Sequence, residues 1–128
     1  AKLRMDAIKL GLHVKLDTLK VNSKKTGVRD DIVAARYERF NPDVKSQALR
    51  WCVVRQAGWD QEGLPEGWSW HNITKRPDLD KLNELLVRVS EDVVVIEAFD
   101  NRSSVMTLEN KGSSAELLNL WVDDAQKL

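Results

Sequence analysis

The stretch Val93-Val94-Val95-Ile96-Glu97-Ala98-Phe99 decides the fold class, because it contains the longest apolar run of the chain. Branched aliphatic side chains favour extended backbone, and a run without polar alternation is typical of a central strand buried on both faces. Asp100-Asn101 then begins a turn, and we expect a second strand, at a sheet edge, over residues 105–108. The sequence therefore predicts a sheet around this stretch.

Helices are expected on both sides of this strand pair. Over residues 78–90 the apolar residues fall on one helical face. They are Leu79, Leu82, Leu86 and Val89. After the strand pair, Ser113 and the Glu116 that follows it form a capping box. This pattern predicts a last helix that runs to about Lys127.

The N-terminal half is predicted to contain one strand, two helices and a long loop. Leu12, Val14 and Leu16 alternate with polar residues, as in a half-buried strand. Residues 29–40 and 43–57 carry apolar residues at helical spacing, so we expect a helix in each. Residues 58–72 are rich in glycine, which favours a loop with at most a short strand over residues 68–73.

These segments together predict one globular α+β domain over residues 1–128, either a whole protein or the ordered core of a longer chain. The expected architecture is a small mixed sheet of three to four strands covered by about four helices. A chain of this length buries enough surface to fold without disulfides or metals. The strand order does not follow from the pattern alone.

Composition restricts the compartment and the class of partner. Cys52 is the one cysteine, so an internal disulfide is excluded and a reducing, cytoplasmic location is expected. No apolar run is long enough to span a membrane, so we expect no membrane partner. Charge is split, with 13 Lys/Arg against 7 Asp/Glu in residues 1–60 and 7 against 13 in residues 61–128. Such a split steers one half toward polyanions or lets two copies pair.

A short acidic motif offers one candidate catalytic site. Lys75-Arg76-Pro77-Asp78-Leu79-Asp80-Lys81-Leu82 resembles the "KPDLDNL" motif of RusA-type Holliday-junction resolvases. The resemblance implies a magnesium-dependent nuclease that cuts branched DNA as a dimer. Asp78, Asp80 and Asp100 would then be the metal-binding acids, and Lys111 would face the developing charge. The same acids are also explained as a helix N-cap, a first-turn acid and a turn residue.

Aromatic and basic residues offer a second candidate site, for a nucleic acid or a protein partner. Tryptophans in or beside the glycine-rich loop are candidates for exposed stacking or hot-spot residues. They are Trp59, Trp68 and Trp70. Basic residues of the loop before residue 30 and of the helix expected after it are candidates for a phosphate-facing surface. They are Lys24, Lys25, Arg29, Arg36 and Arg39. The alternatives are that the tryptophans roof the core and the charges are solvated.

The leading hypothesis is a non-enzymatic interaction or assembly protein that self-associates, most simply as a homodimer, with a candidate nucleic-acid-facing basic surface. It requires no cofactor, and a phage or mobile-element accessory protein would fit such a chain. The alternative hypothesis is the magnesium-dependent nuclease. The two differ in what they expect of the acids. The nuclease needs Asp78, Asp80 and Asp100 to converge, whereas the interaction protein leaves them as separate caps and turns.

Overall fold

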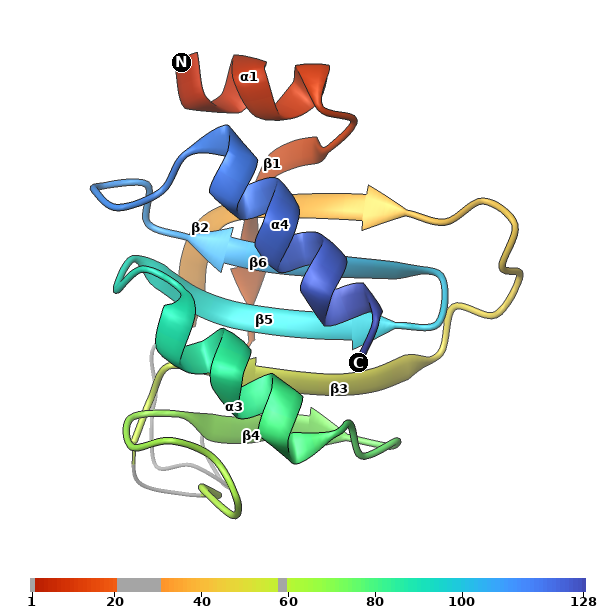
Figure 1. Ribbon diagram of the computed structural model, residues 1–128, viewed down its shortest axis with the longest axis vertical. Helices are drawn as coiled ribbons and strands as arrows, with labels where there is room; N and C mark the ends of the chain where they lie inside the picture. The colour runs from red at the N-terminus through yellow and green to blue at the C-terminus, as the bar shows by residue number, and fades with distance from the viewer. Residues whose placement is uncertain (1, 21–30, 58–59) are drawn as a thin grey trace.

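The computed structural model describes residues 2–20, 31–57 and 60–128 of the chain (Figure 1). Six strands and three helices occur along these residues. The strands are β1 (His13–Leu19), β2 (Ile32–Phe40), β3 (Leu49–Val54), β4 (Ser69–Ile73), β5 (Val93–Phe99) and β6 (Arg102–Thr107). The helices are α1 (Lys2–Lys9), α3 (Leu79–Arg88) and α4 (Ala115–Gln126).

The strands form one antiparallel sheet in the order β1-β2-β6-β5-β3-β4. The α+β class is confirmed, but the expected mixed sheet of three to four strands under about four helices is wrong. Six strands pair, and the described residues contain three helices. β6 also begins three residues earlier than expected and lies between β2 and β5, so it is not an edge strand.

The main error concerns β2 and β3, which the spacing of apolar residues predicted as helices. In β2 the alternate residues Arg36 and Glu38 point to a buried polar interior, so charged residues stand where a strand pattern would normally show apolar ones. In β3 the run from Trp51 to Val54 is buried on both faces, which removes the alternation altogether. Helix and strand periods are hard to distinguish under these two conditions.

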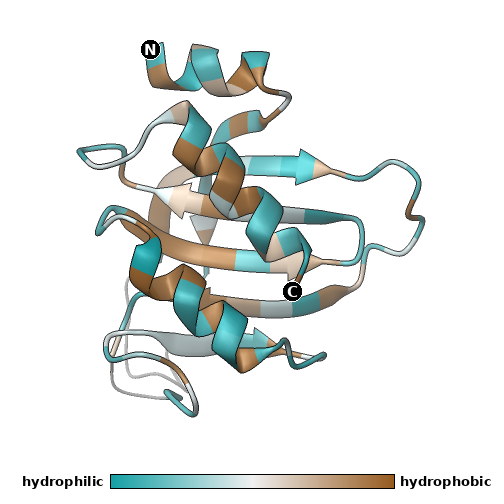
Figure 2. Ribbon diagram, viewed as in Figure 1, coloured by the Kyte–Doolittle hydropathy of each residue, from teal (hydrophilic) through white to brown (hydrophobic). Residues whose placement is uncertain are grey.

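Helices α3 and α4 cover one face of the sheet and enclose the main core (Figure 1). The largest side chains buried there are aromatic or aliphatic, and they include Tyr37, Trp51, Trp68, Trp70, Leu82, Leu85 and Leu118. Figure 2 shows hydrophobic residues along most of β5, whereas α3 and α4 carry both hydrophobic and hydrophilic stripes. The predicted helix over residues 78–90 and the predicted strand over residues 93–99 are confirmed.

None of the helices described is long and apolar enough to cross a membrane.

The N-terminal helix α1 is fastened to the sheet by a three-residue clasp. Arg4 donates two hydrogen bonds to the carboxylate of Glu109, at 2.9 and 2.5 Å, and the Tyr37 hydroxyl donates a third, at 2.5 Å. Glu109 has φ of +61°, a left-handed conformation that is uncommon outside glycine. The hydrogen bond from Arg4 is the main reason that the pKa of Glu109 lies below its ordinary value. The clasp thus joins α1, β2 and the segment after β6.

The sheet curls until its two ends approach each other. In a flat sheet, five strand spacings of about 4.8 Å would separate β1 from β4 by about 24 Å. The structure instead places a ring nitrogen of His71 in β4 only 3.0 Å from the carbonyl oxygen of Lys20, directly after β1. In Figure 1, β1 correspondingly runs behind β2, β6 and β5. The sheet is therefore a rolled but open barrel, whose inner face is the face turned away from α3 and α4.

Candidate functional site

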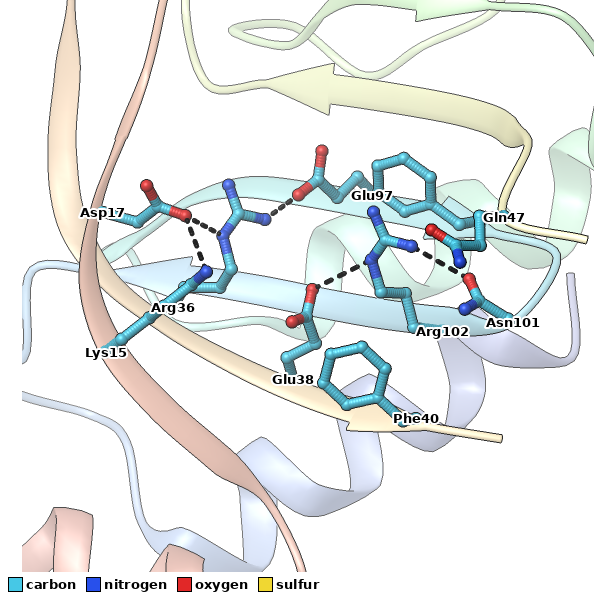
Figure 3. Close-up of a pocket in the computed structure, with 10 residues that line it drawn as sticks. Lys15, Asp17, Arg36, Glu38, Phe40, Gln47, Glu97, Asn101 and Arg102 are labelled. Carbon is cyan, nitrogen blue, oxygen red and sulfur yellow. Dashed lines mark hydrogen bonds and ion pairs between the residues drawn. The ribbon is translucent and has the colours of Figure 1, made fainter. Parts of the chain in front are cut away.

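The inside of the curl is apolar at one end and polar at the other. At the apolar end a second small core packs beneath the sheet, formed by Ala34, Cys52, Val54, Val95 and Met106. Burial in this core raises the pKa of the Cys52 thiol to about 12. At the other end the interior opens to solvent as a pocket of about 590 Å³, which we call the mouth (Figure 3). It is lined by Lys15, Asp17, Arg36, Glu38, Phe40, Gln47, Glu97, Phe99, Asn101 and Arg102.

The floor of the mouth is a buried ionic network centred on Arg36. The Arg36 guanidinium forms an ion pair with Glu97, and only 9% and 6% of these two side chains are exposed. Its Nε also donates to Asp17 Oδ2 at 2.8 Å, and its Nη1 donates to Ser104 Oγ at 2.7 Å. Ser104 Oγ in turn donates to Glu97 Oε1 at 2.9 Å. The network therefore links β1, β2, β6 and β5 across the interior.

Asp17 is the member of this network nearest to solvent. Burial alone would raise its pKa, but the Thr18 N–H and the Arg36 guanidinium together hold that pKa below its ordinary value. Lys15 Nζ lies 3.7 Å from Asp17 Oδ2 and is well exposed. Asp17 therefore stays ionised and has one oxygen that faces Arg36 and Lys15 and another that faces the backbone of Thr18.

The rim of the mouth combines a second ion pair with aromatic rings (Figure 3). Arg102 Nε lies 3.5 Å from Glu38 Oε2, and its guanidinium lies 3.8 Å from the centre of the Phe99 ring. Arg102 Nη1 also donates to Asn101 Oδ1 at 2.9 Å. Phe40 is 44% exposed at this rim. With three cations and three anions, the lining is neutral and presents no single charged field.

Strand β1 borders the mouth and is also the free end of the sheet. It pairs with β2 along one edge, and no main-chain partner for its other edge occurs among the residues that the structure describes. The Thr18 N–H donates instead to Asp17 Oδ1, at 2.8 Å. On the outer face, Leu16 is 67% exposed and Val33, opposite Thr18 in β2, is 61% exposed. An unpaired strand edge beside exposed apolar side chains is a surface to which another strand can add.

The structure places the predicted acids in three separate roles. Asp78 caps α3 by accepting a hydrogen bond from the Lys81 N–H at 3.2 Å, and Asp80 lies in the first turn of that helix. Asp100 follows β5 and accepts a hydrogen bond from Ser46 Oγ at 2.7 Å. Among the described residues, no group of three His, Cys, Asp or Glu side chains is placed to hold a metal ion. The geometry therefore provides no support for a magnesium site.

Lys111, the remaining residue of that set, is exposed in the loop between β6 and α4. Its backbone N–H donates to the carboxylate of Asp92. This contact holds the loop against the turn that precedes β5. It gives the lysine a structural setting distinct from that of the three acids.

Of the two alternatives for Trp68 and Trp70, the structure shows the roof over the core and not the exposed platform. Trp68 and Trp70 are each only 2% exposed and pack in the main core. The Arg55 guanidinium lies 4.5 Å from the centre of the Trp68 ring, and the indole N–H of Trp70 donates to the Glu62 carbonyl at 2.8 Å. Both tryptophans belong to the same core cluster as Leu82, Leu85 and Leu86 of α3. Trp59 lies outside the described residues.

The predicted basic surface is also rearranged. Arg36 and Arg39 were expected on one helix, but they lie on opposite faces of a strand. Arg36 points into the mouth, whereas Arg39 Nε lies 3.0 Å from Asp123 Oδ1 of α4. Both guanidinium groups are thus paired with carboxylates. Lys24, Lys25 and Arg29 lie outside the described residues.

Sequence reasoning missed the residues that line the mouth, apart from Arg36. The signal was present in β2, where Arg36, Glu38 and Phe40 recur with a period of two and reverse the usual polar-outside pattern. A matching polar residue, Glu97, interrupts the apolar run of β5. Arg36 and Glu97 carry opposite charges, but only the strand order shows that they are partners. We find no significant match between this chain and any protein-family model, curated protein or solved structure.

Proposed function

We propose that the protein is a non-enzymatic interaction module that self-associates, and that the edge of β1 is the surface through which two copies meet. The single observation that supports this proposal is the edge of β1 that has no main-chain partner within residues 2–20, 31–57 and 60–128, next to the exposed side chains of Leu16 and Val33. Strand addition would satisfy the main-chain groups of this edge and remove apolar surface from water at the same time.

The energetic argument rests on Leu16. Full burial of a leucine side chain contributes about 1.5–3 kcal/mol. Because 67% of Leu16 is exposed, its burial at a two-fold interface would contribute about 1–2 kcal/mol from each copy. Main-chain hydrogen bonds add to this contribution, and the neutral mouth beside β1 creates no net repulsion between copies.

Nucleic acid is a less favoured partner for the described surface. The cations of the mouth are matched by an equal number of anions, and Arg39 is paired with Asp123. Phosphate binding depends on cations that are available to replace counterions. A cation already engaged with a carboxylate contributes less to such binding, so a second copy of the chain is the partner that we propose.

The test is the effect of Leu16→Lys on the oligomeric state. Sedimentation velocity over a wide concentration range should show the wild type shifting from monomer toward dimer as the concentration rises, and Leu16→Lys remaining monomeric. Val87→Lys is the matched control, because Val87 is 71% exposed on α3, away from β1. If both variants associate as the wild type does, β1 is not the interface.

A further inference from the structure

We propose that two copies pair through β1 in one specific register, antiparallel and with the two-fold axis at Leu16. This inference rests on the proposed self-association and specifies how the two copies fit. In this register Leu16 lies opposite Leu16 of the second copy, and Lys15 lies opposite Asp17 of the second copy. A two-fold axis repeats each contact, so the interface has two such Lys15–Asp17 pairs.

The charge pattern of β1 is complementary to itself only in this arrangement. Lys15 and Asp17 stand on either side of Leu16 and carry opposite charges, and they lie on the same face of the strand. An antiparallel pair centred on Leu16 places unlike charges directly opposite each other, which stabilises a strand pair. A parallel pair in register would place Lys15 against Lys15 and Asp17 against Asp17, which is unfavourable.

The backbone fits this register, and the charges select it from the registers in which edge-facing residues pair with each other. The Thr18 N–H is bonded to the Asp17 side chain, so it points along the free edge of β1 rather than to β2. Along an edge strand, every second residue turns its main-chain N–H and C=O toward the free edge. Val14 and Leu16 therefore face the same edge as Thr18. A pair centred on Leu16 sets Val14 opposite Thr18 of the second copy. The main-chain groups that face the free edge in one copy then meet those that face the free edge in the other.

The exposed side chains match this arrangement on both faces of the strand. On the outer face, the two Leu16 side chains would meet at the axis, and each would lie near an exposed Val33. On the inner face, Lys15 of the second copy would reach the Asp17 carboxylate at the border of the mouth. The second copy thus contributes a residue to the mouth. The contact between His71 and Lys20 lies just beyond the last residue of β1, outside residues 14–18, which are the residues that pair in this register.

A reciprocal charge exchange tests the register. Lys15→Glu alone would place two carboxylates opposite each other at each of these contacts, and Asp17→Lys alone would place two ammonium groups there. Each variant should therefore dimerise about ten- to a hundredfold more weakly than the wild type. An equimolar mixture of the two should recover wild-type dimerisation, because each of its contacts joins a lysine to an acid. Sedimentation velocity measures both effects.

The control for the change of charge is Lys81→Glu, an exposed lysine on α3 away from β1. It should leave dimerisation unchanged. Thermal unfolding followed by circular dichroism checks that each variant is folded, since Asp17→Lys also removes one of the two carboxylates that pair with Arg36. If both variants are folded and the mixture remains monomeric, the register is wrong.

A second measurement keeps the native charges and holds even if Asp17→Lys does not fold. Opposite residues in an antiparallel pair have Cα atoms about 5.5 Å apart, which a disulfide can span. Leu16→Cys should therefore form a cross-linked dimer on mild oxidation. Thr18→Cys should not, because four residues of offset separate the two cysteines by about 13 Å. Cys52 is buried and present in both variants.

The outcomes separate the register from the proposed function. If the wild type dimerises but Leu16→Cys does not cross-link and the charge exchange fails, the register is overturned while self-association stands. If the wild type is monomeric at every concentration, both proposals fail. Cross-linking by Leu16→Cys alone, with recovery in the mixture, is the result that the register predicts.

Discussion

The buried ion pair between Arg36 and Glu97 makes the floor of the mouth sensitive to the loss of one charge. Glu97→Gln preserves the size of the side chain and its acceptor for Ser104, but it removes the negative charge that faces Arg36. Removal of one partner from a buried pair usually costs about 3–5 kcal/mol, because the other charge is left uncompensated.

The structure indicates a value slightly below that range. Asp17 still lies 2.8 Å from the Arg36 guanidinium, and one third of its side chain is exposed, so the charge of Arg36 is partly compensated. We therefore expect Glu97→Gln to lower the free energy of unfolding by about 2–3 kcal/mol. For a chain of this length, such a change lowers the melting temperature by about 6–15 °C.

Urea denaturation of the wild type and the variant measures this loss directly. Asp123→Asn is the matched control, because it also changes an acid to an amide in an ion pair with arginine, but both partners there are more than 30% exposed. We expect the control to change the free energy of unfolding by less than about 1 kcal/mol. If Glu97→Gln is no more destabilising than Asp123→Asn, the network at the floor of the mouth is solvated and our account of it is wrong.

Two further predictions concern titratable groups. The pKa values of Asp17 and Glu109 are lowered in the folded state, so the unfolded chain binds protons first as the pH falls. The stability that these groups contribute should be complete above the ordinary carboxyl pKa of about 4 and be lost as the pH falls through the lower folded values. Urea denaturation at several pH values measures this loss, which should be smaller in Glu109→Gln. The raised pKa and burial of Cys52 predict that iodoacetamide modifies it, by mass spectrometry, only after unfolding, and rapid modification of the native protein would contradict this.

Segments with a single dominant signal were predictable from the sequence. The helix over residues 78–90 has one apolar face, and the strand over residues 93–99 is a branched apolar run, so local preference and tertiary burial agree there. The last helix was also predictable, although its N-cap is Ser114 and not Ser113. The two serines are adjacent, and only the backbone conformation decides which of them accepts the hydrogen bond from the Leu117 N–H.

The candidate site was not predictable in the same way, because it depends on the curl of the sheet. Asp17 and Arg36 lie on the consecutive strands β1 and β2, whereas Glu97 lies far along the chain on β5, and the three meet on the enclosed inner face. A charged residue in an apolar strand does not identify its partner without the strand order. Asp78 and Asp80 of the resolvase-like motif show the opposite case. They are close in sequence, but one is the N-cap and the other a first-turn charge of the same helix.

Self-association through β1 is the central claim, and sedimentation equilibrium of the wild-type protein at several concentrations tests it most directly. The open edge of β1 and the exposed Leu16 predict a reversible equilibrium between monomer and dimer that shifts toward dimer as the concentration rises. A single monomeric species at every concentration would contradict the claim.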